Sequence, residues 1–406
     1  MNTFEQIAER ERQYLLQTYN RYPIVLTRGK GVFLWDIEEK RYLDFVSGLG
    51  VNALGHAHPR IVKAIREQAA KLVHVSNLYY HEYQGPLAEK LCVLAGSSLG
   101  NARAFFSNSG TEAIEGSIKL ARLAGHRVGG AAKCRLVALE GSYHGRTFGA
   151  LSLTGQDKHR KGFEPLLEDV TFVKQNDLEG LRAAVNDNTC AIVLEPIFGE
   201  GGIYECSVEF LQECRALADR HKVALIFDEI QCGLGRTGTI FAFQSFGVTP
   251  DIVAIAKPIA AGLPLGAFIA KEEFASAISP GQHGTTFGGG PLACRIALEF
   301  LAIVEEEKLL ENVNKVGAYL HQELQGLVEK RAAATGVRGR GFIQGIQLEI
   351  PARPIVDAAL AEGVLFNSTQ DTVVRFLPPF LMEEKHIDKG IRVLKKLLGK
   401  KRKAAA

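Results

Sequence analysis

The sequence has few cysteines, and their spacing does not favour pairing. Its seven cysteines are scattered over 406 residues, are odd in number and never form a Cys-x-x-Cys motif. We therefore expect neither a disulfide framework nor a zinc site. Long apolar runs are also missing, since no stretch reaches the about 18 apolar residues of a membrane span. The first residues, MNTFEQIAERERQYLLQ, are charged and have no apolar signal-peptide core, so a cytoplasmic protein without a membrane partner is expected.

The chain also lacks a charge imbalance. Its 48 Lys and Arg residues against 45 Asp and Glu residues leave a net charge of +3, which gives no general argument for a nucleic-acid partner. One basic cluster stands near the C-terminus, at Lys395, Lys396 and 400–403. We interpret it as a solvated tail, with a polyanion contact as the alternative. The length permits a large core and two domains.

Four short, almost wholly apolar segments predict buried strands. They are residues 135–140, 190–195, 223–229 and 251–257. A strand covered on both faces reads as a continuous apolar run rather than an alternating one. Between the second and third segments, Phe210, Cys214 and Leu217 form a helical stripe, with Ser207 as the expected N-cap. Strand, helix and strand at this spacing predict an α/β fold with a parallel sheet and right-handed crossovers.

The two ends of the chain predict a second, smaller α+β domain. Residues 31–45 read as a hairpin, while residues 341–350 and 372–380 read as strands that precede a final amphipathic helix. We expect an N-terminal segment at 1–55 that contributes to the small domain, a large domain at 56–300 and the rest of the small domain at 301–406.

Each of the four predicted strands ends in an ionisable residue, namely Glu140, Glu195, Asp228 or Lys257. One such residue would indicate only solvent exposure at a strand end. Four of them indicate a site, because ligands of open α/β sheets bind beyond the carboxyl ends of the strands.

Three features of these segments match the needs of pyridoxal phosphate. A small-residue turn at 107–111 opens a predicted helix, whose free amides suit a phosphate, although a simple N-capped helix is the alternative. The pattern is neither a P-loop nor a dinucleotide motif. Asp228 ends a buried strand and needs a cationic partner, such as a pyridinium nitrogen. Lys257, in IAKPIAAGLPLG, is set among apolar residues, which favours a nucleophilic amine.

Two further loops carry candidate binding residues. In GSYHGRT, Tyr143 could cover one face of a planar cofactor, or pack in the core, and Arg146 could clamp a carboxylate, or lie free on the surface. In HGTTFGGGP, Thr285 and Thr286 offer hydroxyls to a phosphate.

Taken in order, the motifs resemble those of the class III pyridoxal-phosphate aminotransferases of fold type I. They are NSGTEA, HGRT, EPIFGEGG, DEIQCGLGRTG, AKPIAAGLPLGA and HGTTFGGGPLAC. The resemblance spans roughly residues 18–396. It implies a large domain with a mostly parallel, seven-stranded type of sheet between helices. The N-terminal segment, SNLYY at 76–80 and NSTQDTVVRFLPP at 367–379 are similar to the branch of the family that acts on N2-acetylornithine.

The resemblance implies roles around pyridoxal 5'-phosphate. Lys257 would be the Schiff-base lysine and proton shuttle, and Asp228 would keep the pyridine nitrogen protonated. Gln231 would lie near the phenolic oxygen, and Tyr143 would stack on the ring.

Phosphate binding is implied for residues of two subunits. Gly110 and Thr111 would bind the phosphate at the helix start. Thr286 would reach it from the other subunit, because the active sites of the family lie at a homodimer interface.

Substrate contacts are implied as well. Arg146 would hold a substrate carboxylate, with Thr285 nearby. Arg375 would hold the second carboxylate, and Glu200 would pair with Arg375 when the amino donor has no distal carboxylate. Tyr19 would line the substrate pocket.

The implied reaction moves the terminal amino group of N2-acetylornithine to 2-oxoglutarate, a step of arginine biosynthesis. Ornithine, succinylornithine, succinyl-diaminopimelate or 4-aminobutyrate as donor, and an aminomutase of the same fold, stay open as alternatives. A non-catalytic protein on the same fold would lack the lysine or the aspartate. Phe198, Ile114 and Gly290 depart from the usual Gln, Asn and Asn of the motifs, and Phe198 is expected to bear on substrate preference.

Overall fold

A seven-stranded sheet forms the centre of the molecule in the computed structural model, which describes residues 3–399. Its strands, in spatial order, are β4 (Ala102–Ser107), β10 (Gly266–Lys271), β9 (Ile252–Ile255), β8 (Ala224–Asp228), β7 (Thr189–Leu194), β5 (Arg135–Leu139) and β6 (Val170–Val173). β10 runs antiparallel to β4 and β9, and the other neighbouring pairs are parallel. The four strands predicted from apolar runs are β5, β7, β8 and β9, and their prediction is confirmed.

Both faces of this sheet are buried, which explains the continuous apolar runs. In β7, Ile192 and Leu194 belong to one apolar cluster and Ala191 and Val193 to another. Helix α5 (Gly110–Gly129) contributes to the second cluster, whereas α9 (Val208–His221) and α12 (Pro291–Glu306) contribute to the first. Ser207 caps α9 by accepting the amide of Phe210 at 3.1 Å, as predicted.

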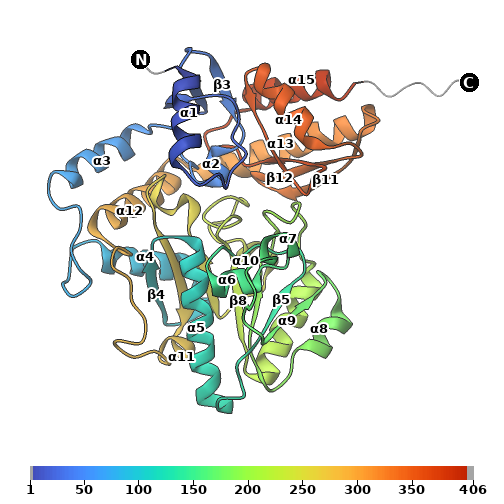
Figure 1. Ribbon diagram of the computed structural model, residues 1–406. Helices are drawn as coiled ribbons and strands as arrows, with labels where there is room; N and C mark the ends of the chain where they lie inside the picture. Colours follow the sequence, from blue (N-terminus) through green and yellow to red (C-terminus); the bar gives the residue numbers. More distant parts are fainter. Residues whose placement is uncertain (1–2, 400–406) are drawn as a thin grey trace, which may run out of the picture.

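The two ends of the chain come together above the central sheet (Figure 1). Strands β1 (Leu26–Lys30), β2 (Phe33–Asp36) and β3 (Arg41–Asp44) are joined by β13 (Val364–Leu365), which lies parallel to β3. A second small sheet orders β11 (Ala334–Arg340), β12 (Ile343–Leu348), β15 (Val373–Phe376) and β14 (Asn367–Thr369). The hairpin expected at 31–45 is β2 with β3. The domain boundaries near residues 55 and 300 stay a prediction.

Helices complete the two parts. Those near the chain ends are α1 (Phe4–Tyr14), α2 (Ser47–Gly50), α13 (Leu309–Lys330), α14 (Ala352–Ala361) and α15 (Glu384–Leu397). The others are α3 (Pro59–Ala69), α4 (Gln84–Ala95), α6 (Phe148–Leu153), α7 (Asp157–Arg160), α8 (Leu178–Ala184), α10 (Phe243–Phe246), α11 (Glu272–Ala275) and the 3-10 helices η1 (Ser97–Leu99) and η2 (Lys257–Ala260). Between residues 3 and 399, no helix has the length and apolar character needed to cross a bilayer. Residues 400–403 of the basic cluster lie outside the described residues.

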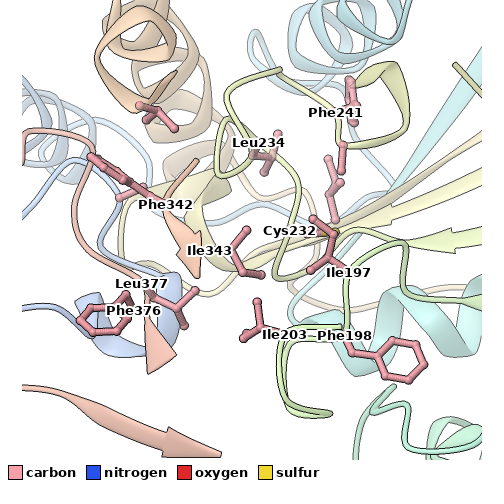
Figure 2. Close-up of a cluster of buried hydrophobic side chains, with 14 of the residues drawn as sticks. Ile197, Phe198, Ile203, Cys232, Leu234, Phe241, Phe342, Ile343, Phe376 and Leu377 are labelled. Carbon is pink, nitrogen blue, oxygen red and sulfur yellow. The ribbon is translucent and has the colours of Figure 1, made fainter. Parts of the chain in front are cut away.

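A continuous apolar cluster joins the central sheet to the C-terminal sheet. Figure 2 shows Ile197 and Ile203 from the loop after β7, Cys232 from the turn after β8, and Ile343 and Phe376 from β12 and β15. These side chains are buried. The loops that follow the central strands are therefore held between two layers of structure, which positions the side chains they carry.

Candidate active site

A cavity of about 420 Å³ opens at the carboxyl ends of the central strands. Glu195 follows β7, Asp228 ends β8 and Lys257 stands two residues after β9. The cavity lining includes eight of the predicted site residues: Gly110, Thr111, Tyr143, Arg146, Glu200, Asp228, Gln231 and Lys257. The structure thus brings together residues that lie as far apart in the sequence as 110 and 257.

Lys257 supplies the amine of this cavity. It is partly buried and opens η2. Burial lowers its pKa, and the nearby charge of Glu200 opposes that effect without cancelling it. A lowered pKa increases the fraction of neutral, nucleophilic amine near neutral pH. The loop that follows also lines the cavity, and its Gly262 has a φ of +110° that side chains rarely adopt.

Asp228 is buried at the end of β8 and is held on both oxygens. Its Oδ1 accepts the amide of Ile230 at 3.0 Å, and its Oδ2 lies 2.8 Å from Nδ1 of His144. His144 is also buried, and its Nε2 has no hydrogen-bond partner among residues 3–399. The sequence pointed to the neighbours of His144 in GSYHGRT but assigned this histidine no role.

Glu195 is a second residue that sequence reasoning left without a role. Its side chain accepts the amides of Tyr143 at 2.8 Å and Gly199 at 2.9 Å. Burial, followed by the negative charge of Asp228, raises the pKa of this carboxyl. Glu195 therefore joins two loops of the cavity, one carrying Tyr143 and the other Glu200. Its place at a strand end was the available signal.

The expectation that all four strand ends face one site is wrong for Glu140. This side chain is exposed and does not line the cavity. Glu140 forms a backbone bridge with Gly155, whereas residues 143–146, which follow it, line the cavity.

Arg375 and Glu200 form the ion pair that the family resemblance implied. Nη1 of Arg375 lies 2.7 Å from Oε1 of Glu200 and also donates to Oε1 of Gln231 at 3.0 Å. Arg375 is buried, and Asn367 accepts from its Nη2 at 2.6 Å. Burial favours the neutral form of Glu200, but Arg375 and Lys257 outweigh it and lower the pKa of Glu200 to about 2. Glu200 is therefore ionised at neutral pH.

The start of α5 forms the third part of the cavity. Ser109 caps the helix by accepting the amide of Glu112 at 3.3 Å. The first amides of a helix have no partner within it, so those of Gly110 and Thr111 are available to an anion. A Cβ atom at Gly110 would lie only 2.7 Å from the side chain of Ile230, which requires glycine there.

Together these groups fit pyridoxal 5'-phosphate. The cavity combines an amine for an aldehyde, a buried carboxylate for a ring nitrogen and a helix start for a phosphate. Tyr143 lies beside them, with its hydroxyl accepting from Nε of Arg146 at 3.2 Å. The fit rests on the chemistry of these donors and acceptors.

Four residues discussed from the sequence do not line this cavity. Tyr19 is exposed and lines a separate cavity of about 880 Å³ beneath α1. Thr286 is exposed, and Thr285 accepts from Asn108, a lining residue, at 3.1 Å. Phe198 is buried and would meet a Cβ atom at Gly201 within 2.6 Å. Phe198 therefore packs behind the glycine loop and does not line the active-site cavity (Figure 2), and its effect on substrate preference stays a prediction.

The fold and cavity define an α/β enzyme with its site at the carboxyl edge of a mostly parallel sheet. The model of the family described as "Aminotransferase class-III" matches residues 14–398. The chain belongs to the class III aminotransferases, a family that depends on pyridoxal phosphate.

Relatives and solved structures agree with this assignment. The chain is 46% identical over 384 residues to the acetylornithine aminotransferase of Methanocaldococcus jannaschii, covering 95% of this chain and 96% of the relative. The chain is also 45% identical to the acetylornithine aminotransferase of Aquifex aeolicus, covering 95% of this chain and 100% of the relative. The ornithine aminotransferase of Toxoplasma gondii superposes with a TM-score of 0.93 at 30% identity, covering 98% and 95%. An acetylornithine aminotransferase from Elizabethkingia anophelis superposes with a TM-score of 0.86 at 32% sequence identity, covering 98% of this chain and 99% of that chain.

Proposed function

We propose that this aminotransferase moves the terminal amino group of N2-acetylornithine to 2-oxoglutarate and uses pyridoxal 5'-phosphate held by Lys257 and Asp228. The products would be N-acetylglutamate 5-semialdehyde and glutamate, as in arginine biosynthesis. One observation carries the chemistry: a lysine amine and a buried carboxylate share one cavity at the ends of adjacent strands β9 and β8. The names of the relatives support the choice of donor.

When bound, the cofactor would supply an electron sink that carries an amino group between two substrates. The amine of Lys257 would take a proton from one carbon atom of the substrate and deliver it to a second atom. Its lowered pKa favours this proton transfer, because more of the amine is neutral. The carboxylate of Asp228 would hold a proton on the ring nitrogen. The amides of Gly110 and Thr111 would bind the phosphate, and the ring of Tyr143 would cover one face.

Substrate carboxylates would be held by two arginines. Arg146, exposed at the cavity mouth, would bind the carboxylate of the donor. Arg375 would bind the distal carboxylate of 2-oxoglutarate or glutamate. When the donor is bound, Glu200 would neutralise Arg375, as in the ion pair at 2.7 Å.

We test the donor with a panel on the cofactor-loaded protein. The value of kcat/KM is compared for N2-acetylornithine, N2-succinylornithine, ornithine and 4-aminobutyrate, each with 2-oxoglutarate. We expect acetylornithine to lead by ten-fold or more, about 1.4 kcal/mol of transition-state binding. Ornithine is the second candidate, because the fold superposes on an ornithine aminotransferase with a TM-score of 0.93. A lead for ornithine would overturn the proposed donor.

The chemistry is tested with Lys257→Ala. We expect loss of turnover and of the absorbance change on adding amine, because no other amine replaces Lys257 among the residues that line the cavity. Lys63→Ala, an exposed lysine of α3, is the matched control and should behave as the wild type. Turnover by Lys257→Ala at the wild-type rate would refute the mechanism.

The proposal includes a cytoplasmic homodimer with shared sites. The exposed position of Thr286, outside the cavity of its own chain, is compatible with a hydroxyl offered to a partner subunit. Light scattering of the purified protein should give twice the chain mass, and a monomer would contradict this part of the proposal.

A further inference from the structure

A second cavity adjoins the active site on the far side of Glu200. We call it the outer cavity. Its volume is about 460 Å³, and its lining consists of Gln156, Lys158, His159, Glu200, Pro351, Arg353, Ser368, Thr369, Gln370 and Asp371. Glu200 also lines the active-site cavity. Glu200 is therefore shared by the two cavities.

The main chain at Glu200 is fixed on both sides of this shared residue. The carbonyl of Glu200 accepts from Oγ1 of Thr369 at 2.6 Å and from Nε2 of Gln370 at 2.9 Å. The preceding amide, of Gly199, donates to Glu195 at 2.9 Å. With the backbone held, a change in the position of the Glu200 carboxylate must come from rotation of its side chain.

Arg375 cannot hold two carboxylates with the same nitrogen. Its Nη1 lies 2.7 Å from Glu200, and its Nη2 donates to Asn367 at 2.6 Å. A distal carboxylate of an oxo acid needs this guanidinium face, so the carboxylate of Glu200 must move away first. Because Glu200 is ionised, its new position must offer positive charge.

The outer cavity offers that charge through Lys158, with the imidazole of His159 as a hydrogen-bond donor beside it. Lys158 is exposed at its rim, and no hydrogen bond or ion pair of its amine is found within residues 3–399. His159 is partly buried and contacts the ring edge of Tyr143, with centroids 5.6 Å apart. Burial, followed by the charges of Arg146 and Lys158, lowers the pKa of His159, and the charge of Glu200 opposes them only in part. The imidazole is therefore neutral near pH 7 and offers a ring N–H donor rather than a charge. Arg353, the other cation of the lining, is already paired with Asp357 at 2.7 Å.

We propose that Lys158 and His159 receive the carboxylate of Glu200 in the outer cavity when the distal carboxylate of the acceptor occupies Arg375. Lys158 and His159 are then positioning residues of the oxo-acid half-reaction. They lower the free-energy cost of opening the Arg375–Glu200 pair, and they do not touch the acceptor. This inference rests on the proposed function, since it assumes an acceptor with a second carboxylate.

The test compares two acceptors on one cofactor-loaded variant. Lys158→Met with His159→Gln removes the free ammonium and the imidazole of the outer cavity, and leaves Arg353 paired with Asp357. Single-turnover kinetics then give the apparent Kd for 2-oxoglutarate, which needs Arg375 free, and for pyruvate, which has no distal carboxylate. We expect the apparent Kd for 2-oxoglutarate to rise about ten-fold. The apparent Kd for pyruvate should rise by a factor that is at least five times smaller.

Two controls separate positioning from general damage. Lys161→Met, an exposed lysine just after α7, should leave both acceptors at wild-type affinity. In a Glu200→Gln background, the double substitution should no longer discriminate between the acceptors, because no charge needs a new position. The inference is overturned if both acceptors lose the same affinity or if neither loses any. It is also overturned if the double substitution still discriminates between the acceptors in the Glu200→Gln background.

The kinetics with the amino donor distinguish this inference from a second role of the outer cavity, which is binding of the donor. If the double substitution instead raises the KM of the amino donor alone, the outer cavity binds the donor and the inference is wrong. Failure of the proposed function is recognised separately, because the wild-type protein would then transfer no amino group to 2-oxoglutarate from any amine of the panel.

Discussion

At the scale of single residues, several buried charged groups of the candidate site have defined partners. Asp228 lies against His144, and Arg375 contacts both Glu200 and Asn367. Charges removed from water are tolerated only when partners compensate their lost hydration. Substitution of one partner therefore affects the stability of the protein as well as its chemistry.

Glu200 gives a pH-dependent prediction. Its pKa is about 2 in the folded chain, below its ordinary value of 4.5. A lowered carboxyl pKa adds stability above pH 4.5 that is lost as the pH falls toward 2. In urea titrations between pH 5 and 3, we expect the unfolding free energy of the wild type to fall more steeply than that of Glu200→Gln. The full effect is on the order of 2–3 kcal/mol.

The matched control is Glu67→Gln, an exposed glutamate of α3. It should keep the wild-type slope, because an exposed pair contributes little. Equal slopes for the wild type and Glu200→Gln would show that the ion pair does not lower the pKa of Glu200.

At the scale of elements, short turns decide where each helix and strand delivers its chemistry. Ser109 caps α5 and Ser207 caps α9 through the same type of hydrogen bond. Of these two helices, only α5 begins at the active-site cavity. The glycine at its first position allows α5 to lie directly against Ile230 in the turn after β8.

Gly110→Ala tests this close approach. The added methyl group would lie within 3.0 Å of three atoms of Ile230, so the start of α5 or the turn must shift. We expect the affinity for pyridoxal 5'-phosphate to fall ten-fold or more, measured by cofactor release under dialysis. Gly326→Ala in α13, where a Cβ atom meets nothing within 4 Å, should keep wild-type affinity. Unchanged affinity in Gly110→Ala would refute a phosphate site at this helix start.

At the scale of the whole molecule, Arg236 joins the central sheet to both ends of the chain. It is fully buried in the turn region after β8. Its guanidinium donates to the carbonyls of Phe342 at 3.3 Å, Gly50 at 3.4 Å and Pro378. It also lies 4.7 Å from the ring centre of Phe380. Burial lowers the pKa of Arg236 to about 9, and the charge of Asp44 opposes this effect. Because about 9 is still above 7, the guanidinium is charged at neutral pH.

Arg236→Met should destabilise the protein by about 3 kcal/mol or more, since buried carbonyls lose their donors. Urea denaturation followed by fluorescence and by circular dichroism measures the loss and shows whether both parts still unfold together. Arg66→Met, an exposed arginine of α3, should change stability by less than about 0.5 kcal/mol. A similarly small effect in Arg236→Met would mean that the apolar cluster alone holds the parts together.

Much of this molecule could be predicted from short-range patterns. The strands β5, β7, β8 and β9 were recognisable because burial on both faces selects uninterrupted apolar residues. The cap of α9 was recognisable because a serine before a helical stripe satisfies a free amide. The grouping of Asp228 with Lys257 followed from the rule that parallel strands present their ends to one edge.

Other features required the folded chain, because the direction of a side chain after a strand depends on the turn that follows and on what packs against it. Glu195 faces the cavity since the amides of Tyr143 and Gly199 lie there, whereas Glu140, in an equivalent place, faces solvent. Phe198 packs behind the glycine loop although Glu200, two residues later, lines the site. The outer cavity arises where the β14–β15 hairpin meets α7, two segments about 200 residues apart. Local residue chemistry cannot determine such contacts, since they come from long-range packing.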